Sequence, residues 1–148
     1  MDLILWRHAD AEDGADDAAR ALTSKGLKQA KHVAAWLDRR LPADARVIAS
    51  PAVRAQQTAQ VLARESATVD ALKPGASPAA VLHAAGWPAG DGTVVVVGHQ
   101  PTLGAAAALA LTGKPVQWRV RKGALWWISV RAGEASPLVV AVLSPDLV

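Results

Sequence analysis

The stretch Leu3-Ile4-Leu5-Trp6-Arg7-His8 decides the fold of this chain. It is a short apolar run that passes directly into an arginine and a histidine. A continuous apolar run of this length, bounded by polar residues, predicts a buried strand of a parallel sheet. Because open α/β sheets bind ligands beyond the carboxyl ends of their strands, Arg7 and His8 leave the core where such folds do chemistry.

Two later segments repeat this design. Val47-Ile48-Ala49-Ser50 leads into Pro51-Ala52-Val53-Arg54, and the run from Val94 to Gly98 leads into His99. Three strand ends therefore offer two arginines and two histidines. No Ser-His-Asp, Cys-His or metal-ligand set competes with them.

Helical patterns separate these strands. After Thr23, a candidate N-cap, apolar residues recur at helical spacing until Pro42 stops the helix. The expected buried positions of this helix are Leu27, Ala30, Ala34, Leu37 and Leu41. Pro51 suits the first position of the next helix, which would place Arg54 on the first turn, near an amino end that attracts anions. The narrow apolar face of that second helix comprises Ala52, Ala55, Ala59, Leu62 and Ala63.

The rest of the chain completes an α/β pattern within a single domain, residues 1–148. We expect strands at 46–50, 68–70, 93–98, 116–120, 124–130 and 138–143, and helices at 78–85 and 102–111, the latter ended by Gly113. The βαβαβ alternation up to residue 111 predicts a mostly parallel sheet with right-handed crossovers and helices on both faces. Short glycine-containing turns after that point favour antiparallel C-terminal strands.

Composition narrows the class of protein. The chain has 148 residues, no cysteine, a net charge of +3 and a sequence pI of about 9.7. The absence of cysteine excludes disulfides and thiolate chemistry and fits a reducing cytoplasm, which we expect to be its location. No leader and no apolar run of membrane-spanning length is present, so no membrane association is expected. The basic residues are scattered and not interleaved with aromatics, which argues against nucleic-acid binding, although an anionic substrate would suit them.

Several polar residues have weaker claims to a function. The acidic run from Asp10 to Asp17 does not have the spacing of a calcium loop, so we expect a solvated loop and no metal. Asp10 is the exception, because it lies two residues from His8 and could face the site. His32 and His83 have no apparent partner and are expected to be structural.

Four motifs in order resemble the histidine phosphatase (phosphoglycerate mutase-like) superfamily across about two thirds of the chain. Arg7-His8-Ala9 resembles its Arg-His-Gly signature, with alanine in place of the usual glycine. The other three motifs are Leu22-Thr23 with Gly26, Gln29 and Ala30; Ser50-Pro51 with Arg54, Ala55, Gln57, Thr58 and Ala59; and Val97-Gly98-His99-Gln100-Pro101. The small size and the Arg-His-Ala variant are most similar to the SixA-type phosphohistidine phosphatases. The resemblance implies a three-layer α/β/α fold.

The resemblance also implies a mechanism without a cofactor. His8 would be the nucleophile and form a phosphohistidine intermediate, for which its ring must be neutral. Arg7 and Arg54 would lower its pKa and neutralise the phosphoryl oxygens, and His99 would donate to the same oxygens. Arg20, which precedes the Leu22-Thr23 motif, is a further candidate phosphate ligand.

The general acid is the gap in this pattern. Many members of the superfamily carry a carboxylate in the segment after the third strand, where this chain reads Val69-Asp70-Ala71. Asp70 is one position away from the expected place, and Asp10 is a second candidate. A site without a strong acid should favour leaving groups that depart easily, such as imidazole.

The expected function is therefore dephosphorylation of a protein phosphohistidine, for example on a histidine phosphotransfer domain in signal transduction. The segment 71–92 is too short to form a lid, so an open site that accepts a phosphorylated side chain is expected. Two alternatives remain open at this point. One is a general small-molecule phosphatase of the same superfamily, and the other is a phosphate-binding module without turnover.

Overall fold

The structure is a computed structural model that describes all residues 1–148. Its strands are β1 (Asp2–Arg7), β2 (Arg46–Ala49), β3 (Ala67–Thr68), β4 (Thr93–Gly98), β5 (Leu125–Ser129) and β6 (Leu138–Leu143). Its helices are α1 (Ser24–Asp38), α2 (Val53–Gln60), α3 (Pro78–Ala85) and α4 (Thr102–Thr112), with the short 3-10 helices η1 (Asp17–Ala19), η2 (Asp70–Leu72) and η3 (Pro145–Leu147). None of the helices combines the length and the apolar character needed to cross a bilayer.

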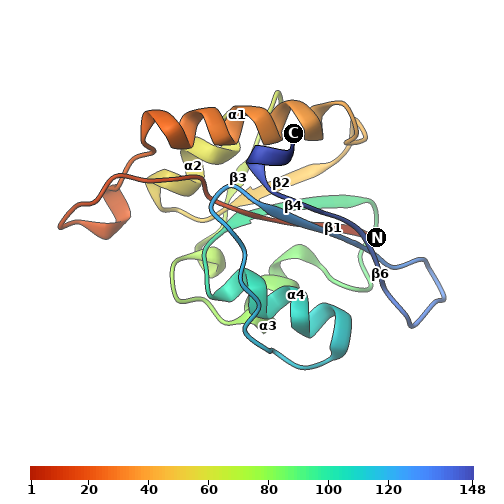
Figure 1. Ribbon diagram of the computed structural model, residues 1–148. Helices are drawn as coiled ribbons and strands as arrows, with labels where there is room; N and C mark the ends of the chain where they lie inside the picture. Colours follow the sequence, from red (N-terminus) through yellow and green to blue (C-terminus); the bar gives the residue numbers. More distant parts are fainter.

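One six-stranded sheet forms the middle layer, in the order β3-β2-β4-β1-β5-β6. The first four of these strands are mutually parallel, whereas β5 and β6 are antiparallel to their neighbours. Helices α1 and α2 cover one face and α3 and α4 the other (Figure 1). The expected three-layer α/β/α fold with antiparallel C-terminal strands is confirmed.

The central strand β1 serves both halves of the core. Successive side chains of a strand point to opposite faces. Ile4 and Trp6 pack in the cluster beneath α1 and α2, whereas Leu3 and Leu5 pack in the cluster beneath α3 and α4. Because both faces of β1 are covered, its carboxyl end delivers Arg7 and His8 to the edge of a closed core.

Local signals place several elements as expected. Thr23 caps α1 by accepting a hydrogen bond from the amide of Gly26 at 2.9 Å, and Gly113 ends α4 in the left-handed conformation with φ of 78°. On α1, however, Leu27 is 39% exposed and not buried as expected. Val33, which is not among the expected positions, is fully buried. The buried face of α1 also includes Gly26. Asp10 packs so closely against Gly26 that a Cβ at this position would overlap the carbonyl oxygen of Asp10.

Two further helix predictions need correction. Helix α2 begins at Val53 rather than at Pro51, because Ala52 still has extended backbone angles. The helix ends at Gln60, so Ala63 lies beyond it and is exposed, while Ala55 and Ala59 are buried as expected.

The predicted strands after residue 65 also differ in part. The short third strand is Ala67–Thr68, and Asp70 already belongs to η2. The predicted strand 116–120 is wrong, because both edges of β1 are already taken by β4 and β5. The segment 114–120 instead runs over the surface, and side chains satisfy some of its carbonyls: Gln100 donates to Trp118 at 2.9 Å, and Arg7 donates to Val120 at 2.8 Å.

Gly104 lets α4 approach this surface segment. A Cβ at Gly104 would overlap the carbonyl oxygen of Trp118, which is backbone and cannot rotate away. We expect Gly104→Ala to lower the free energy of unfolding by about 1–3 kcal/mol, the usual cost of overpacking. Urea titration followed by circular dichroism measures it. Gly14→Ala is the matched control, because its Cβ would meet only the Arg20 side chain at an ordinary 3.5 Å. Equal losses for the two variants would contradict this role of Gly104.

Candidate active site

The carboxyl ends of β1, β2 and β4 meet at one edge of the sheet, and the side chains that follow them lie together. Register pairing places Arg7 beside Gly98, immediately before His99, and Ala49 beside Val97. The rings of His8 and His99 are 5.1 Å apart between centroids, and Arg54 Nε donates to His8 Nε2 at 3.3 Å. His8, His99 and Arg54 are each no more than 6% exposed. The structure therefore gathers three of the four main predicted site residues in direct contact.

His8 is held as one tautomer. Its Nδ1 lies 2.7 Å from the carbonyl oxygen of Ala9, which can only accept, so Nδ1 carries the hydrogen. Nε2 therefore carries the lone pair of the ring, and this lone pair accepts the hydrogen bond from Arg54 Nε. The backbone of Ala9 is fixed in turn by Thr58, whose hydroxyl accepts its N–H at 3.1 Å.

The His8 ring is neutral at physiological pH. Burial, the largest cause, and the nearby charges of Arg54, Arg7 and Arg20 together lower its pKa to about 4, although the hydrogen bond with the Ala9 carbonyl acts in the opposite direction. Burial, His8 and Arg54 likewise lower the pKa of His99 to about 3. Both rings are therefore available as neutral groups.

His99 is oriented by Ser50, which directly follows β2. Its Nε2 lies 2.7 Å from Ser50 Oγ, and Ser50 Oγ also accepts the amide of Ala52 at 3.2 Å. If the Ser50 hydroxyl donates to Nε2, only one buried group, the Nδ1–H of His99, lacks a protein partner. The opposite arrangement would leave both the hydroxyl hydrogen and Nδ1 unsatisfied. Hydrogen-bond satisfaction thus favours a free N–H donor on His99.

The two arginines are fixed by different partners. Arg7 donates from Nη1 to the carbonyl of Val120 at 2.8 Å, and its Nε is buried without a partner. Arg54 donates from Nη1 to the backbone carbonyl of Asp17 at 2.8 Å and from Nη2 to the Asp17 carboxylate at 3.2 Å. The guanidinium of Arg54 therefore has its outer edge clamped by Asp17 and its Nε directed to His8.

Asp17 is a site residue that the sequence did not reveal. The acidic run was expected to be solvated, and most of it is exposed, yet η1 brings Asp17 onto Arg54 and Arg20. Hydrogen bonds from Arg20 and Arg54 lower the pKa of its carboxyl, so it is ionised. Ser50 was likewise noticed only as part of a motif. No signal local to either residue could have shown these contacts, because their partners lie 37 and 49 residues away.

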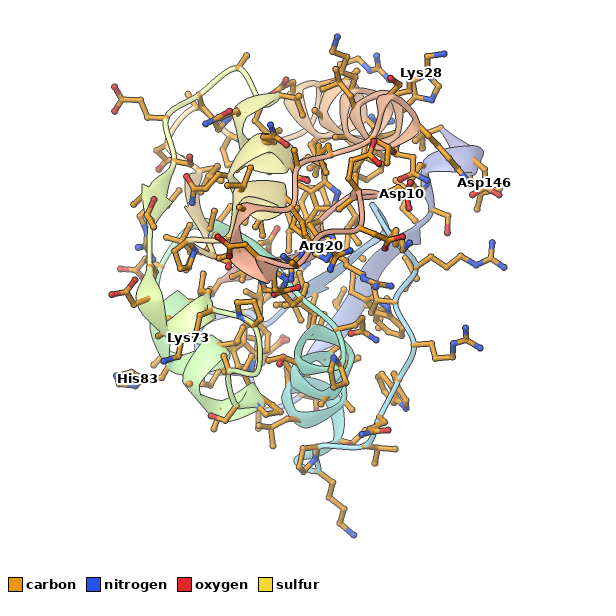
Figure 2. The ribbon with its side chains drawn as sticks, turned by 90° about the vertical axis from the view of Figure 1, so that its left-hand side faces the viewer. Asp10, Arg20, Lys28, Lys73, His83 and Asp146 are labelled. Atoms are coloured by element: carbon orange, nitrogen blue, oxygen red, sulfur yellow. The ribbon has the colours of Figure 1, made fainter.

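The remaining candidates stand at the rim of the site. Arg20 donates from Nε to the Glu12 carbonyl at 2.7 Å and from Nη1 to Asp17 at 3.1 Å, so it reaches the cluster through Asp17. Figure 2 shows Arg20 in front of the sheet edge, with Asp10 above it and Lys73 and His83 well to one side. Asp70 is exposed at the start of η2 and makes no side-chain hydrogen bond or ion pair with the cluster.

The carboxylate of Asp10 is not suited to act as a general acid. One of its carboxylate oxygens accepts from Thr23 Oγ1 and the other from Lys122 Nζ, both at 2.8 Å. These hydrogen bonds lower the pKa of its carboxyl. An ionised carboxylate that two donors already occupy has no proton to give. Asp10 instead links Thr23, at the amino end of α1, to Lys122 in the turn before β5.

No group of three or more His, Cys, Asp or Glu side chains is arranged to hold a metal ion. Positive charge at this site comes instead from Arg7 and Arg54. The arrangement thus offers a neutral imidazole whose lone pair faces Arg54, two guanidinium groups and a second imidazole with an unpartnered N–H. Such a set can receive a tetrahedral oxyanion beside a nitrogen nucleophile.

Comparisons with known proteins agree with this geometry. The family model described as the histidine phosphatase superfamily (branch 1) matches residues 3–74. An uncharacterized protein of Picosynechococcus sp. (strain PCC 7002) is 35% identical over 146 residues, covering 91% of this chain and 87% of the relative. The phosphohistidine phosphatase SixA of Escherichia coli (strain K12) is 39% identical over 59 residues, which are 39% of this chain and 37% of SixA.

Similarity in three dimensions extends over the whole chain. The structure of the protein histidine phosphatase SixA complexed with tungstate superimposes with a TM-score of 0.83 at 23% identity, covering 99% of both chains. This match shows that the fold is shared. The chain therefore belongs to the histidine phosphatase superfamily, branch 1, and is a phosphatase of the hydrolase class.

Proposed function

We propose that this protein hydrolyses phosphohistidine on a protein substrate through a phosphohistidine intermediate on His8. The observation that carries the proposal is the state of His8: a buried, neutral ring with Nδ1–H bound to the Ala9 carbonyl and an Nε2 lone pair that faces Arg54 Nε at 3.3 Å. The partial match to a phosphohistidine phosphatase supports the same substrate class.

The first step transfers the phosphoryl group. His8 Nε2 attacks phosphorus, a new N–P bond forms, and the N–P bond to the substrate imidazole breaks. Arg7 and Arg54 neutralise the phosphoryl oxygens, and the Nδ1–H of His99 donates to one of them. The proton stays on His8 Nδ1, hydrogen-bonded to the Ala9 carbonyl, so the ring becomes a phosphorylated imidazolium, which is a good leaving group for the next step.

The second step reverses the chemistry with water. Water attacks the phosphorus, the N–P bond to His8 breaks, and the ring returns to its neutral form with Nδ1 still protonated. The water's protons go to the phosphate product and to solvent. Only a positioned neutral histidine and fixed positive charge are needed, and the cluster supplies both.

The leaving group determines which substrates suit this site. The two carboxylates nearest to the cluster, Asp10 and Asp17, are both held ionised by hydrogen bonds and cannot protonate a departing oxygen. An alkoxide comes from an alcohol with a pKa of about 16 and needs such a proton, whereas imidazole, with a pKa of about 6.5, can leave protonated at its distal nitrogen. A P–N bond is therefore the favoured target.

This proposal predicts a strong order among substrates. We expect kcat/KM for free phosphohistidine to exceed that for a sugar phosphate by about 100-fold or more, the usual contribution of a missing general acid. Phosphate release assayed side by side on both compounds measures it. p-Nitrophenyl phosphate is the control, because its acidic phenol leaves without help and should be hydrolysed as well. Comparable rates on phosphohistidine and the sugar phosphate would refute the proposed preference.

A further inference from the structure

A strongly basic cleft adjoins the candidate active site and has no part in the mechanism above. Its volume is about 790 Å³, and no hydrophobic residue lines it. The basic side chains around it are Arg7, Lys25, Lys28, His32, Arg119, Arg121 and Lys122. A single acidic residue, Asp146, faces them from η3. Figure 2 shows Lys28 and Asp146 on the same side of the molecule, with Asp10 between them and the site.

Hydrogen bonds to the backbone hold one wall of the cleft next to the active site. Beyond the Arg7 bond to Val120, the amide of Arg7 donates to Ala124 at 2.9 Å, and the amide of Gly123 donates to His8 at 3.1 Å. These bonds hold the chain that carries Arg119, Arg121 and Lys122 against the end of β1. Arg7 itself lines both the cleft and the catalytic cluster, so a ligand could span the two.

Most of the positive charge in the cleft is uncompensated. Lys122 pairs with Asp10 at 2.8 Å, but Lys25, Lys28, Arg119 and Arg121 form no ion pair and are exposed. Lys25 and Lys28 also lie near the amino end of α1, which has no acidic residue in its first turn. Cations are unfavourable at the positive end of a helix dipole, so this placement has a cost that a bound polyanion would relieve.

The shape and lining point to an acidic protein surface rather than to a small metabolite. Sites for small molecules are mostly apolar hollows with a few polar groups, which this cleft is not. Exposed, flexible lysines and arginines around an open cleft match the rim of a protein interface, where complementary charge speeds association and selects the partner.

We propose that the protein substrate presents its phosphohistidine to His8 from a surface rich in aspartate and glutamate that docks into this basic cleft. This inference rests on the proposed function, because the docked partner is the substrate of the same site. It adds a criterion for substrates: acidic residues beside the phosphohistidine.

The test uses two peptides of equal length that carry one chemically phosphorylated histidine, flanked by aspartates in one and by serines in the other. At low ionic strength we expect kcat/KM of the wild-type enzyme to be about tenfold higher on the acidic peptide, and the preference to shrink as salt is added. In the double variant Lys28→Glu/Arg121→Glu the preference should be lost or reversed. Hydrolysis of p-nitrophenyl phosphate should stay within about twofold of wild type.

Arg131→Glu is the control for a charge reversal outside the cleft. Arg131 is exposed in the turn after β5, at the opposite edge of the sheet from His8, and we expect it to keep the preference. Thermal melts followed by circular dichroism show whether each variant is folded. Equal hydrolysis of both peptides by the wild type would overturn the docking inference and leave the proposed function standing. Failure to hydrolyse either peptide or free phosphohistidine would remove the proposed function and, with it, this inference.

Discussion

Replacement of His8 by alanine is expected to lower phosphatase turnover by at least about a thousandfold, because the covalent path then has no nucleophile. The nitrogen that would attack is Nε2, which carries the lone pair because the 2.7 Å contact of Nδ1 with the Ala9 carbonyl fixes the tautomer of the ring. Phosphate release on p-nitrophenyl phosphate and on phosphohistidine measures the loss on two leaving groups.

A trapping experiment separates the nucleophile from a merely structural histidine. Brief incubation of wild-type protein with a ³²P-labelled donor, followed by denaturation, should leave label that is stable in base and labile in acid, as expected for an N–P bond. His8→Ala should carry none. His83→Ala is the matched control, because His83 is exposed on α3 and lies away from the site (Figure 2). Wild-type turnover by His8→Ala, or label that survives acid, would contradict covalent catalysis by His8.

Replacement of Arg54 by alanine is expected to lower kcat/KM by about 100- to 1,000-fold, the usual effect of removing a group that stabilises transition-state charge. The Nε of Arg54 lies 3.3 Å from the attacking nitrogen of His8. Arg7 cannot take its place, because the Nη1 of Arg7 is bound to the carbonyl of Val120. Loss of Arg54 also leaves the Asp17 carboxylate without its buried partner.

The same change should shift the pH profile in a defined direction. His8 attacks as the neutral base, so kcat/KM falls as the pH drops through its pKa, which is about 4 in the native site. The Arg54 charge opposes a second positive charge on His8, so its removal raises the pKa of His8 and moves the acid limb of the profile to higher pH. Burial remains the largest cause of the low pKa, so the limb should stay below the ordinary value of about 6.5.

Arg54→Lys distinguishes charge from geometry. It keeps the positive charge and should leave the acid limb near the wild-type position, yet it lacks the planar fork that holds Asp17 and a phosphoryl oxygen together. Its kcat should therefore remain well below wild type. Measuring all three proteins on p-nitrophenyl phosphate cancels the titration of the substrate itself. An acid limb that does not move in Arg54→Ala would show that this arginine does not set the protonation of His8.

The proposed mechanism uses no general acid, and in this respect it differs from the hydrolysis of phosphate esters of alcohols. Both carboxylates nearest to the cluster are engaged as hydrogen-bond acceptors, Asp17 by two arginines and Asp10 by Thr23 and Lys122. They position cations and helix ends instead of delivering protons. The substrate's own leaving group must then carry that part of the chemistry, which is the physical basis for the proposed preference for P–N bonds.

Some elements could be predicted from the sequence because their signals are local. Helix α3 begins and ends where Ser77 can cap it, Pro78 fits its first turn and Gly86 adopts a left-handed conformation. The valine-rich run of β4 and the six residues of β6 were also placed with their observed bounds. For α3 the capping interactions lie within about four residues of one another, and for the two strands the apolar pattern itself is local, although their pairing partners are not.

The four main candidates could be chosen because Arg7, His8 and His99 end or directly follow an apolar run that must be buried, and Arg54 lies on the first turn of the helix after another such run. Parallel strands deliver their carboxyl ends to one edge. The details of the site depended on contacts between distant parts of the chain. The clamp of Asp17 on Arg54 spans 37 residues and the bond between Ser50 and His99 spans 49. The segment 114–120 is irregular and does not form the expected strand. On the side of β1 opposite β4, it is β5 that pairs with β1.

The sequence by itself thus determined which side chains leave the core at the ends of its strands, because burial and strand periodicity are written in neighbouring residues. Only the tertiary structure decided which nitrogen of His8 carries the lone pair and which carboxylate binds Arg54. It also decided where the lysines and arginines without ion pairs line a common cleft. Those features depend on distances between atoms that the chain brings together only when it folds, and no pattern along the sequence measures such distances.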